Sequence, residues 1–172
     1  MSGGSAAAMR AVELEHSELR QGLRERVASV LASAKSGEGL AETAGELMSF
    51  FGSELLPHAS AEEATIYAVG AGHKATRLLT QVMLDEHRWL ETLVHEYQLV
   101  QNDPIRGAAK AEAIAAMFDM HSANEERYLL PEVFRLSDDP EALVAQVQEG
   151  VDAVIDSFGS ETPADAVAHW FG

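Results

Sequence analysis

Four histidines in this sequence are placed so that their side chains could bind metal ions together. Each lies in a different segment of helical periodicity, among the apolar residues that would face the interior: His16, His58, His87 and His121. Two of them are followed four residues later by a glutamate, since His58 precedes Glu62 and His121 precedes Glu125. This separation places both side chains on one face of a helix. Imidazole and carboxylate groups are ligands that suit iron, manganese and zinc.

The burial of such groups needs a physical reason. In the segment HSANEERYLLP, residues 121–131, His121 and Glu125 share their helical face with apolar residues. Buried charge is costly unless it is paired, hydrogen-bonded or bound to a metal. The spacing by itself is weak evidence, because a chain with 28 acidic residues forms such pairs by chance, as His87 and Glu91 do. The position of the histidines in the fold must therefore decide whether these pairs form a metal site.

Hydrophobic periodicity predicts the helices that position these residues. Apolar residues recur at three- and four-residue steps, and no segment has the alternation of a strand. We expect four long helices and one shorter helix: residues 6–34, 39–69, 74–101, 105–135 and 141–158. Prolines inside the second and fourth helices predict a kink just before His58 and a bend near Pro131.

Long helices joined by short loops pack as antiparallel neighbours. The sequence therefore predicts an all-α fold, an antiparallel up-down-up-down four-helix bundle with an additional C-terminal helix. We expect a single domain over residues 1–172, with the bundle at 6–136, the helix at 139–158 and a tail at 159–172. The fifth helix either caps the bundle or forms a dimer contact.

The four histidines also fall at one level of this bundle. Residues equally distant from the turn that joins two antiparallel helices lie at the same height. Measured from turns near residues 36, 71 and 103, the histidines of successive helices differ by only two to three residues, which is about 3–5 Å along a helix. We therefore expect the four imidazoles to converge, together with Glu62 and Glu125. Three other histidines fail this test and are expected to be structural or exposed: His73, His95 and His169.

Composition excludes several classes of function. A net charge of −16 argues against nucleic acid and against an anionic membrane surface as partners. The absence of cysteine excludes disulfides, a thiolate nucleophile and cysteine-based zinc or iron–sulfur sites. The start of the sequence does not resemble a secretory signal and no apolar run is long enough to span a bilayer, so a cytoplasmic location is expected.

The order of these histidine fragments resembles that of the hemerythrin-like, or HHE cation-binding, domain. The resemblance covers roughly residues 10–135 and rests on four fragments: LEHSELR, HASAEE, DEHRWL and HSANEERYLLP. It implies an oxo- or hydroxo-bridged centre of two iron ions inside the bundle. It further implies six ligands. Glu62 and Glu125 would bridge the two irons. His16 and His58 would lie mainly on one iron, and His87 and His121 mainly on the other.

One difference from oxygen-carrying hemerythrins affects the expected function. Those proteins have two histidines four residues apart on the third helix, whereas Met83 and Glu91 flank His87 at that distance. The missing fifth histidine argues against reversible oxygen carriage. Water or one of several side chains would complete the ligand shell: Glu91, Glu63, Glu126, Tyr67 or Tyr128. Of the tyrosines, Tyr128 has the better helical phase. Tyr67 is nearly opposite His58 on its helix, although its long side chain could still lean toward the site.

The resemblance implies a protein that reacts with hydrogen peroxide, dioxygen or nitric oxide, with modest catalase- or peroxidase-like activity. An alternative is a non-catalytic sensor of oxygen, nitric oxide or iron, or an iron-holding module, which signals through its C-terminal helix and aromatic tail. A metal-free interaction bundle is a third reading. The ligand set also allows zinc or manganese, and the protein is expected to be a monomer or a homodimer.

Overall fold

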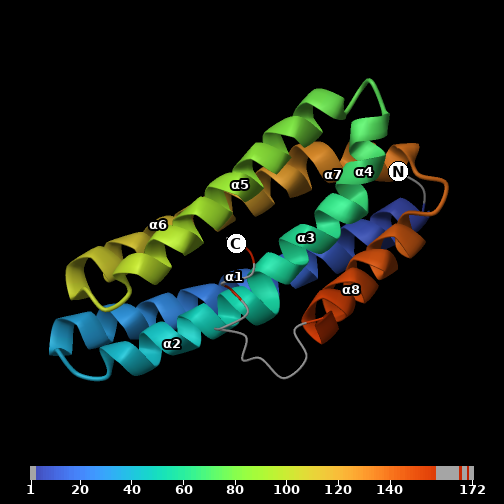
Figure 1. Ribbon diagram of the computed structural model, residues 1–172. Helices are drawn as coiled ribbons and strands as arrows, with labels where there is room; N and C mark the ends of the chain where they lie inside the picture. Colours follow the sequence, from blue (N-terminus) through green and yellow to red (C-terminus); the bar gives the residue numbers. More distant parts are fainter. Residues whose placement is uncertain (1–2, 158–166, 168–169, 171–172) are drawn as a thin grey trace.

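The computed structural model describes residues 3–157, Val167 and Trp170. Its elements form four long helical segments and one more helix (Figure 1). They are α1 (Gly3–Ser36); α2 (Leu40–Phe50), the π-helix η1 (Phe51–Leu55), α3 (Leu56–Ala64) and α4 (Ile66–Gly72); α5 (Arg77–Val100); α6 (Pro104–Asn124), the π-helix η2 (Glu125–Leu129) and α7 (Leu130–Leu136); and α8 (Pro140–Ser157). The described residues contain no strand, and the successive segments run antiparallel. The predicted up-down-up-down bundle with an additional helix is confirmed.

Two π-helical turns occupy corresponding places in the second and fourth segments. Each ends two residues before a proline, since η1 precedes Pro57 and η2 precedes Pro131. A proline lacks an N–H donor, and its ring clashes with the carbonyl four residues earlier, so a wider turn accommodates it. These turns stand where the sequence predicted a kink and a bend. Turns of this kind add a residue and change the helical phase, and they are frequent at functional sites.

Short turns connect the long segments. Gly37 and Gly39 between α1 and α2 have φ angles of 78° and 71°, which glycine adopts without steric cost. Before α6, the Asp103 side chain accepts hydrogen bonds from the backbone N–H groups of Ile105 and Arg106. Pro104 occupies the first turn of that helix, where a missing N–H costs nothing.

The apolar core is divided into two clusters along the bundle. One cluster lies toward the α1–α2 turn and contains Leu23, Phe51 and Tyr97. The other lies toward the opposite end and contains Met9, Tyr67 and Phe134. Between them, each long segment contributes buried polar side chains. The four segments thus present a polar layer at the level that the sequence predicted for the histidines.

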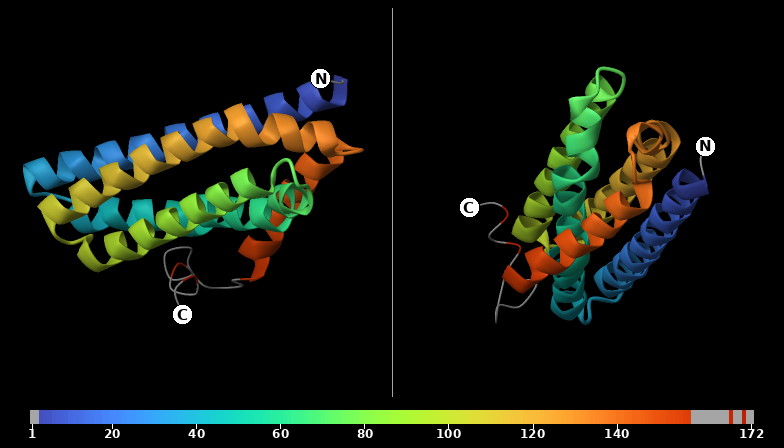
Figure 2. Two further views of the ribbon diagram at one scale, coloured as in Figure 1. Left: turned by 90° about the horizontal axis from the view of Figure 1, so that it is seen from above. Right: turned by 90° about the vertical axis from the view of Figure 1, so that its right-hand side faces the viewer.

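The C-terminal helix α8 packs along α3 and α1 (Figures 1 and 2). A Cβ atom on Gly150 would lie 3.0 Å from the Cβ of Ala61, so the small residue permits this close approach. Of the tail, only Val167 and Trp170 are described, and both pack against the core cluster nearer the α1–α2 turn. The aromatic Trp170 is therefore partly buried. No described helix is both long and apolar enough to cross a membrane.

Candidate metal centre

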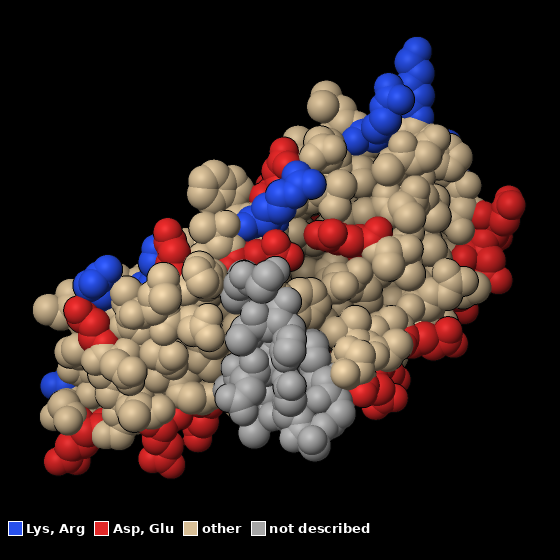
Figure 3. Space-filling model, in the orientation of Figure 1, with Lys and Arg blue, Asp and Glu red and all other residues tan. Residues whose placement is uncertain are grey.

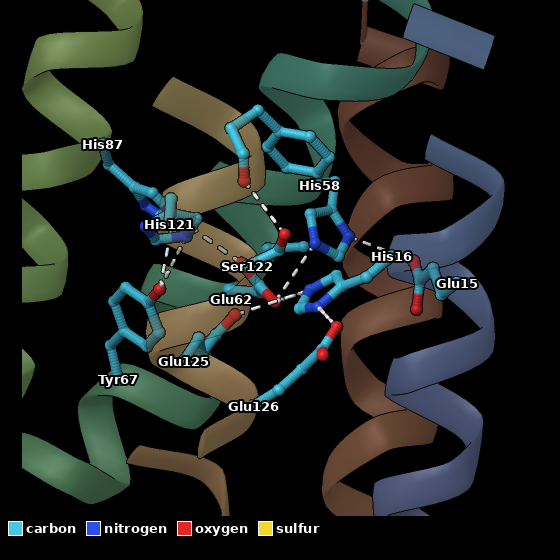
Figure 4. Close-up of polar contacts among 12 residues, drawn as sticks. Glu15, His16, His58, Glu62, Tyr67, His87, His121, Ser122, Glu125 and Glu126 are labelled. Atoms are coloured by element: carbon cyan, nitrogen blue, oxygen red, sulfur yellow. Dashed lines mark hydrogen bonds and ion pairs between the residues drawn. The ribbon is translucent and has the colours of Figure 1, made fainter. Parts of the chain in front are cut away.

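Six side chains from the four long segments meet in the polar layer (Figure 4). None is more than 3% exposed: His16, His58, Glu62, His87, His121 and Glu125. The Oε1 atom of Glu62 lies 3.4 Å from Nε2 of His16 and 3.1 Å from Nε2 of His58. The other carboxylate oxygen, Oε2, lies 3.6 Å from Nε2 of His87. The Nε2 atoms of His87 and His121 are 3.0 Å apart. The structure thus brings together the whole set that the sequence singled out.

Glu62 belongs to two groups of potential metal ligands. It lies with His16 and His58 on one side, and with His87 and His121 on the other, and within each group the ligand atoms are within 4.8 Å of one another. Glu125 adds a second carboxylate, with its Oε2 atom 3.4 Å from Nε2 of His16. A carboxylate has two oxygens, each able to bind a cation. This arrangement therefore suits two adjacent cations that share Glu62.

Several atoms at the centre of the layer are buried without a hydrogen bond. Within the described part of the chain, Nε2 of His58, Oε2 of Glu62 and both carboxylate oxygens of Glu125 have no partner in hydrogen-bonding geometry. Their contacts with Oε1 of Glu62, at 3.1 Å, and with Nε2 of His16, at 3.4 Å, are charge contacts only. An unsatisfied buried polar group costs about 1–3 kcal/mol, and a charged group costs more. A cation among these atoms would satisfy the lone pairs that the fold leaves unpaired. The residues present therefore fit a metal.

The electrostatics of the layer are also unbalanced without a metal. Burial, and then the negative charge of Glu62, raise the pKa of Glu125 to about 7. Burial opposes the ionisation of Glu62 as well, but His58 and His16 outweigh it and hold the pKa of Glu62 well below its usual range. Burial would lower the pKa of His16, yet hydrogen bonds to Glu126 and Glu62 raise it to about 9. A cation bound there would therefore compete with protons for these groups.

Comparison with known protein families agrees with this geometry. Residues 7–133 match the model of the hemerythrin HHE cation-binding domain. The chain belongs to this family. Its family relationship, together with the two His/Glu groups, indicates a protein that binds metal cations. Comparisons with curated proteins and with solved structures gave no significant match.

The two tyrosines considered as ligands of this hemerythrin-like chain lie in different environments. The buried Tyr67 hydroxyl is 3.3 Å from Nε2 of His87 and 3.4 Å from Nε2 of His121. Tyr128 is 49% exposed, and Arg127 lies over its ring. Tyr128, although it has the better helical phase in a regular helix, is therefore not enclosed in the layer, because the π-helix η2 changes the phase after His121. Tyr67 reaches the layer because its long side chain extends from α4 across to α5.

The other residues considered from the sequence fall outside the central layer. Glu91 is partly buried beside Glu63, and burial and that neighbour's charge raise its pKa. Neither it nor Glu126 belongs to the two groups of potential ligands among the described residues. His73 is exposed and His95 is half-buried, in line with structural or surface roles. His169 lies outside the described residues.

A second set of glutamates surrounds the hemerythrin-like centre. The Nδ1 atom of each histidine faces one of these carboxylates at hydrogen-bonding distance: Glu126, Glu15, Glu63 and Glu86. Sequence reasoning considered Glu63 and Glu126 as ligands and did not identify Glu15 or Glu86. Their one sequence signal is adjacency, since Glu15 directly precedes His16 and Glu86 directly precedes His87.

Proposed function

We propose that this protein holds two iron ions in the polar layer and reacts with hydrogen peroxide, dioxygen or nitric oxide. The observation that carries the proposal is the pair of His/Glu groups that share Glu62. His16 and His58 would bind one ion, and His87 and His121 the other. Glu62 and Glu125 would contribute the carboxylates between them. Iron ions bound there would supply Lewis acidity and redox chemistry.

The protein's own residues would control access and protons. The ligand side chains are buried between two apolar clusters, so bulk water and large molecules are kept away. A surface cavity of about 190 Å³, bordered by His58, Glu15, Glu54 and Gln148, leads from the α8 side toward the layer. Tyr67 places a hydroxyl beside His87 and His121, where it could donate a proton or a hydrogen bond to a small ligand.

The acidic surface supports the capture of cations. On the face in Figure 3, aspartate and glutamate side chains follow the lower edge and the right-hand end and also lie across the middle, whereas lysine and arginine lie mainly along the upper edge. A net charge of −16 attracts cations over a distance that salt screening limits. This field raises the local concentration of the metal and gives no selectivity among metals.

The test is metal content combined with spectroscopy. We expect protein purified without chelators to contain about two irons per chain and to show near-ultraviolet and visible absorption from iron ligands. Added peroxide should be consumed while the absorption changes and then recovers. The variant Glu62→Ala should lose both properties, whereas Glu132→Ala, at an exposed ion pair with Arg135, should keep them. Failure to take up iron offered anaerobically would overturn the proposal.

One contact favours sensing as the second candidate function. Gly150 of α8 packs closely on Ala61, which directly precedes Glu62. A change in the position of Glu62 on ligand binding would therefore reach the C-terminal helix through one residue. Slow peroxide consumption together with iron-dependent protease protection of α8 would favour a sensor over an enzyme. Rapid turnover without a change in α8 would exclude it.

A further inference from the structure

The four glutamates around the centre form a pattern that the six candidate ligands alone do not explain. Each is one residue away in sequence from an inward-facing side chain: Glu15 from His16, Glu63 from Glu62, Glu86 from His87 and Glu126 from Glu125. Successive residues of an α-helix point about 100° apart. A glutamate next to an inward residue therefore points sideways, toward the neighbouring helix of the bundle.

Each of these side chains contacts the histidine of another long segment. The Nδ1-to-Oε distances are 2.9–3.0 Å for all four pairs: Glu15 with His58, Glu63 with His87, Glu86 with His121, and Glu126 with His16. The pairs connect α1 to α3, α3 to α5, α5 to α6, and η2 back to α1. They form a closed circuit around the bundle, which we call the glutamate ring. Figure 4 shows its Glu15 and Glu126 contacts on the outer side of the imidazoles.

We propose that the glutamate ring consists of positioning residues that set all four imidazoles for metal binding before a metal arrives. The inference rests on the proposed function only in taking the polar layer to be a metal site. A neutral imidazole donates from one ring nitrogen and accepts at the other. In a neutral ring whose Nδ1–H donates to a glutamate outside the layer, Nε2 keeps its lone pair inside it. In a protonated ring the same contact still turns Nε2 toward the layer, and the metal displaces the Nε2 proton when it binds. Each ligand is thus oriented by the helix beside its own.

The glutamates differ in exposure and in their other contacts, so they should differ in how firmly they hold their histidines. Glu86 is only 12% exposed and also accepts a hydrogen bond from Nδ2 of Asn124 at 3.1 Å. Glu126 is 21% exposed and pairs with Arg20 at 3.1 Å. Glu63 is 38% exposed and has the wettest environment. Because solvent weakens such contacts, Glu86 should position its histidine most firmly and Glu63 least firmly.

The first measurement is the tautomer of His87 in metal-free protein, read by nitrogen-15 NMR at pH 8. Burial lowers the pKa of His87, so its ring is neutral there. We expect a proton on Nδ1 and none on Nε2. Glu63→Ala should move the population toward the Nε2–H form, whereas Glu63→Gln, which keeps an acceptor, should restore much of the Nδ1–H form. Glu13→Ala, at an exposed glutamate of α1, should leave the signals unchanged.

The second measurement is the affinity for zinc, a redox-silent probe. Glu86→Ala should weaken zinc binding about 10–100-fold, the range found for partners of metal-ligating histidines. Glu86→Gln should recover most of this loss, and Glu13→Ala should stay within about twofold of the original protein. Circular dichroism identifies any variant that fails to fold. If an alanine variant does not fold, the glutamine variant at the same position is compared with the original protein instead.

The outcomes separate this inference from the proposed function. An unchanged His87 tautomer in Glu63→Ala, or unchanged zinc affinity in Glu86→Ala, would overturn the positioning role. Loss of affinity that Glu86→Gln does not recover would overturn it as well, because the acceptor would then be irrelevant. If the protein binds zinc and shows these shifts but does not react with peroxide, the result would support the positioning role of the glutamate ring and contradict the proposed oxidant chemistry.

Discussion

Tyr67 stacks on His87 with ring centroids 5.0 Å apart and planes inclined by 24°. Its hydroxyl lies 3.3 Å from Nε2 of that histidine. Burial, and then the charges of Glu125 and Glu62, raise the pKa of Tyr67 well above its usual value. In metal-free protein this phenol is therefore a neutral hydrogen-bonding group. A bound cation would reverse that preference, because positive charge favours the phenolate.

The first prediction concerns this tyrosine. If Tyr67 binds iron as a phenolate, the iron-loaded protein has a visible charge-transfer band that Tyr67→Phe removes while most of the iron remains bound. Tyr128→Phe, at a half-exposed ring, should leave the visible spectrum unchanged. An iron-loaded protein without such a band would show that Tyr67 is only a hydrogen-bonding neighbour of the centre.

The second prediction concerns Glu125, which destabilises the folded protein when no metal is bound. Its carboxylate is buried near Glu62 with neither oxygen hydrogen-bonded to a described residue. Replacement by the neutral Glu125→Gln should raise the free energy of unfolding of metal-free protein at pH 8 by on the order of 1 kcal/mol. The same variant should bind less metal and lose most of the stabilisation that metal gives to the original protein. Urea unfolding with and without zinc measures both effects.

The exposed Glu132→Gln is the matched control for this substitution. It breaks only a surface pair with Arg135. With and without zinc, its free energy of unfolding should therefore lie within about 0.5 kcal/mol of that of the original protein. A lower stability of metal-free Glu125→Gln would contradict the account, since it would mean that the contact with His16 outweighs the cost of burying the carboxylate beside Glu62.

The third prediction concerns pH. The pKa of His16 rises from 6.5 to about 9 on folding, so the folded metal-free protein binds its proton more tightly than the unfolded chain. This stabilisation is complete below about pH 6.5 and is lost as the pH rises through 9. Metal needs the deprotonated ring, so zinc affinity should increase over the same interval. Thermal unfolding of metal-free protein and zinc titrations at pH 6.5, 7.5 and 9 measure these opposite slopes.

A histidine outside the layer provides the comparison for the pH experiment. His73→Gln, at an exposed position, should leave the pH dependence of both the stability and the zinc affinity unchanged. His16→Gln should make both quantities depend less on pH. Zinc affinity that does not change between pH 6.5 and 9 in the original protein would show that no proton is displaced from the centre.

The fourth prediction concerns Gly70, where α4 meets α5. A Cβ atom there would lie 2.4 Å from Oγ1 of Thr80 and 3.3 Å from Cγ2 of Val133. Thr80 is buried and its hydroxyl donates to the carbonyl of Thr76, so it has little room to move. Gly70→Ala should lower the free energy of unfolding by about 1–3 kcal/mol through overpacking. Gly72→Ala meets no atom within 4 Å and should be neutral or slightly stabilising. Equal effects of the two changes in a thermal melt would be evidence against this packing.

The sequence by itself determined the fold and the level of the polar layer. Helical periodicity and the short breaks after about residues 34, 69 and 101 dictate an antiparallel bundle, because each apolar stripe must be buried against the next. Distances counted from the turns then place the histidines at one height, since the rise per residue of a helix is nearly constant. Burial at His16 and His87 follows from their positions within these stripes.

The tertiary structure decided which side chains surround that layer. Tyr128 is half exposed because the π-turn at η2 altered the phase, and a regular 3.6-residue period cannot anticipate an additional residue in one turn. Tyr67 reaches the layer from α4 through the length of its side chain. Glu15 and Glu86 meet histidines of other helices, more than 30 residues away in sequence. Such contacts depend on how adjacent helices are rotated about their axes, and only the packing of the whole bundle fixes that rotation.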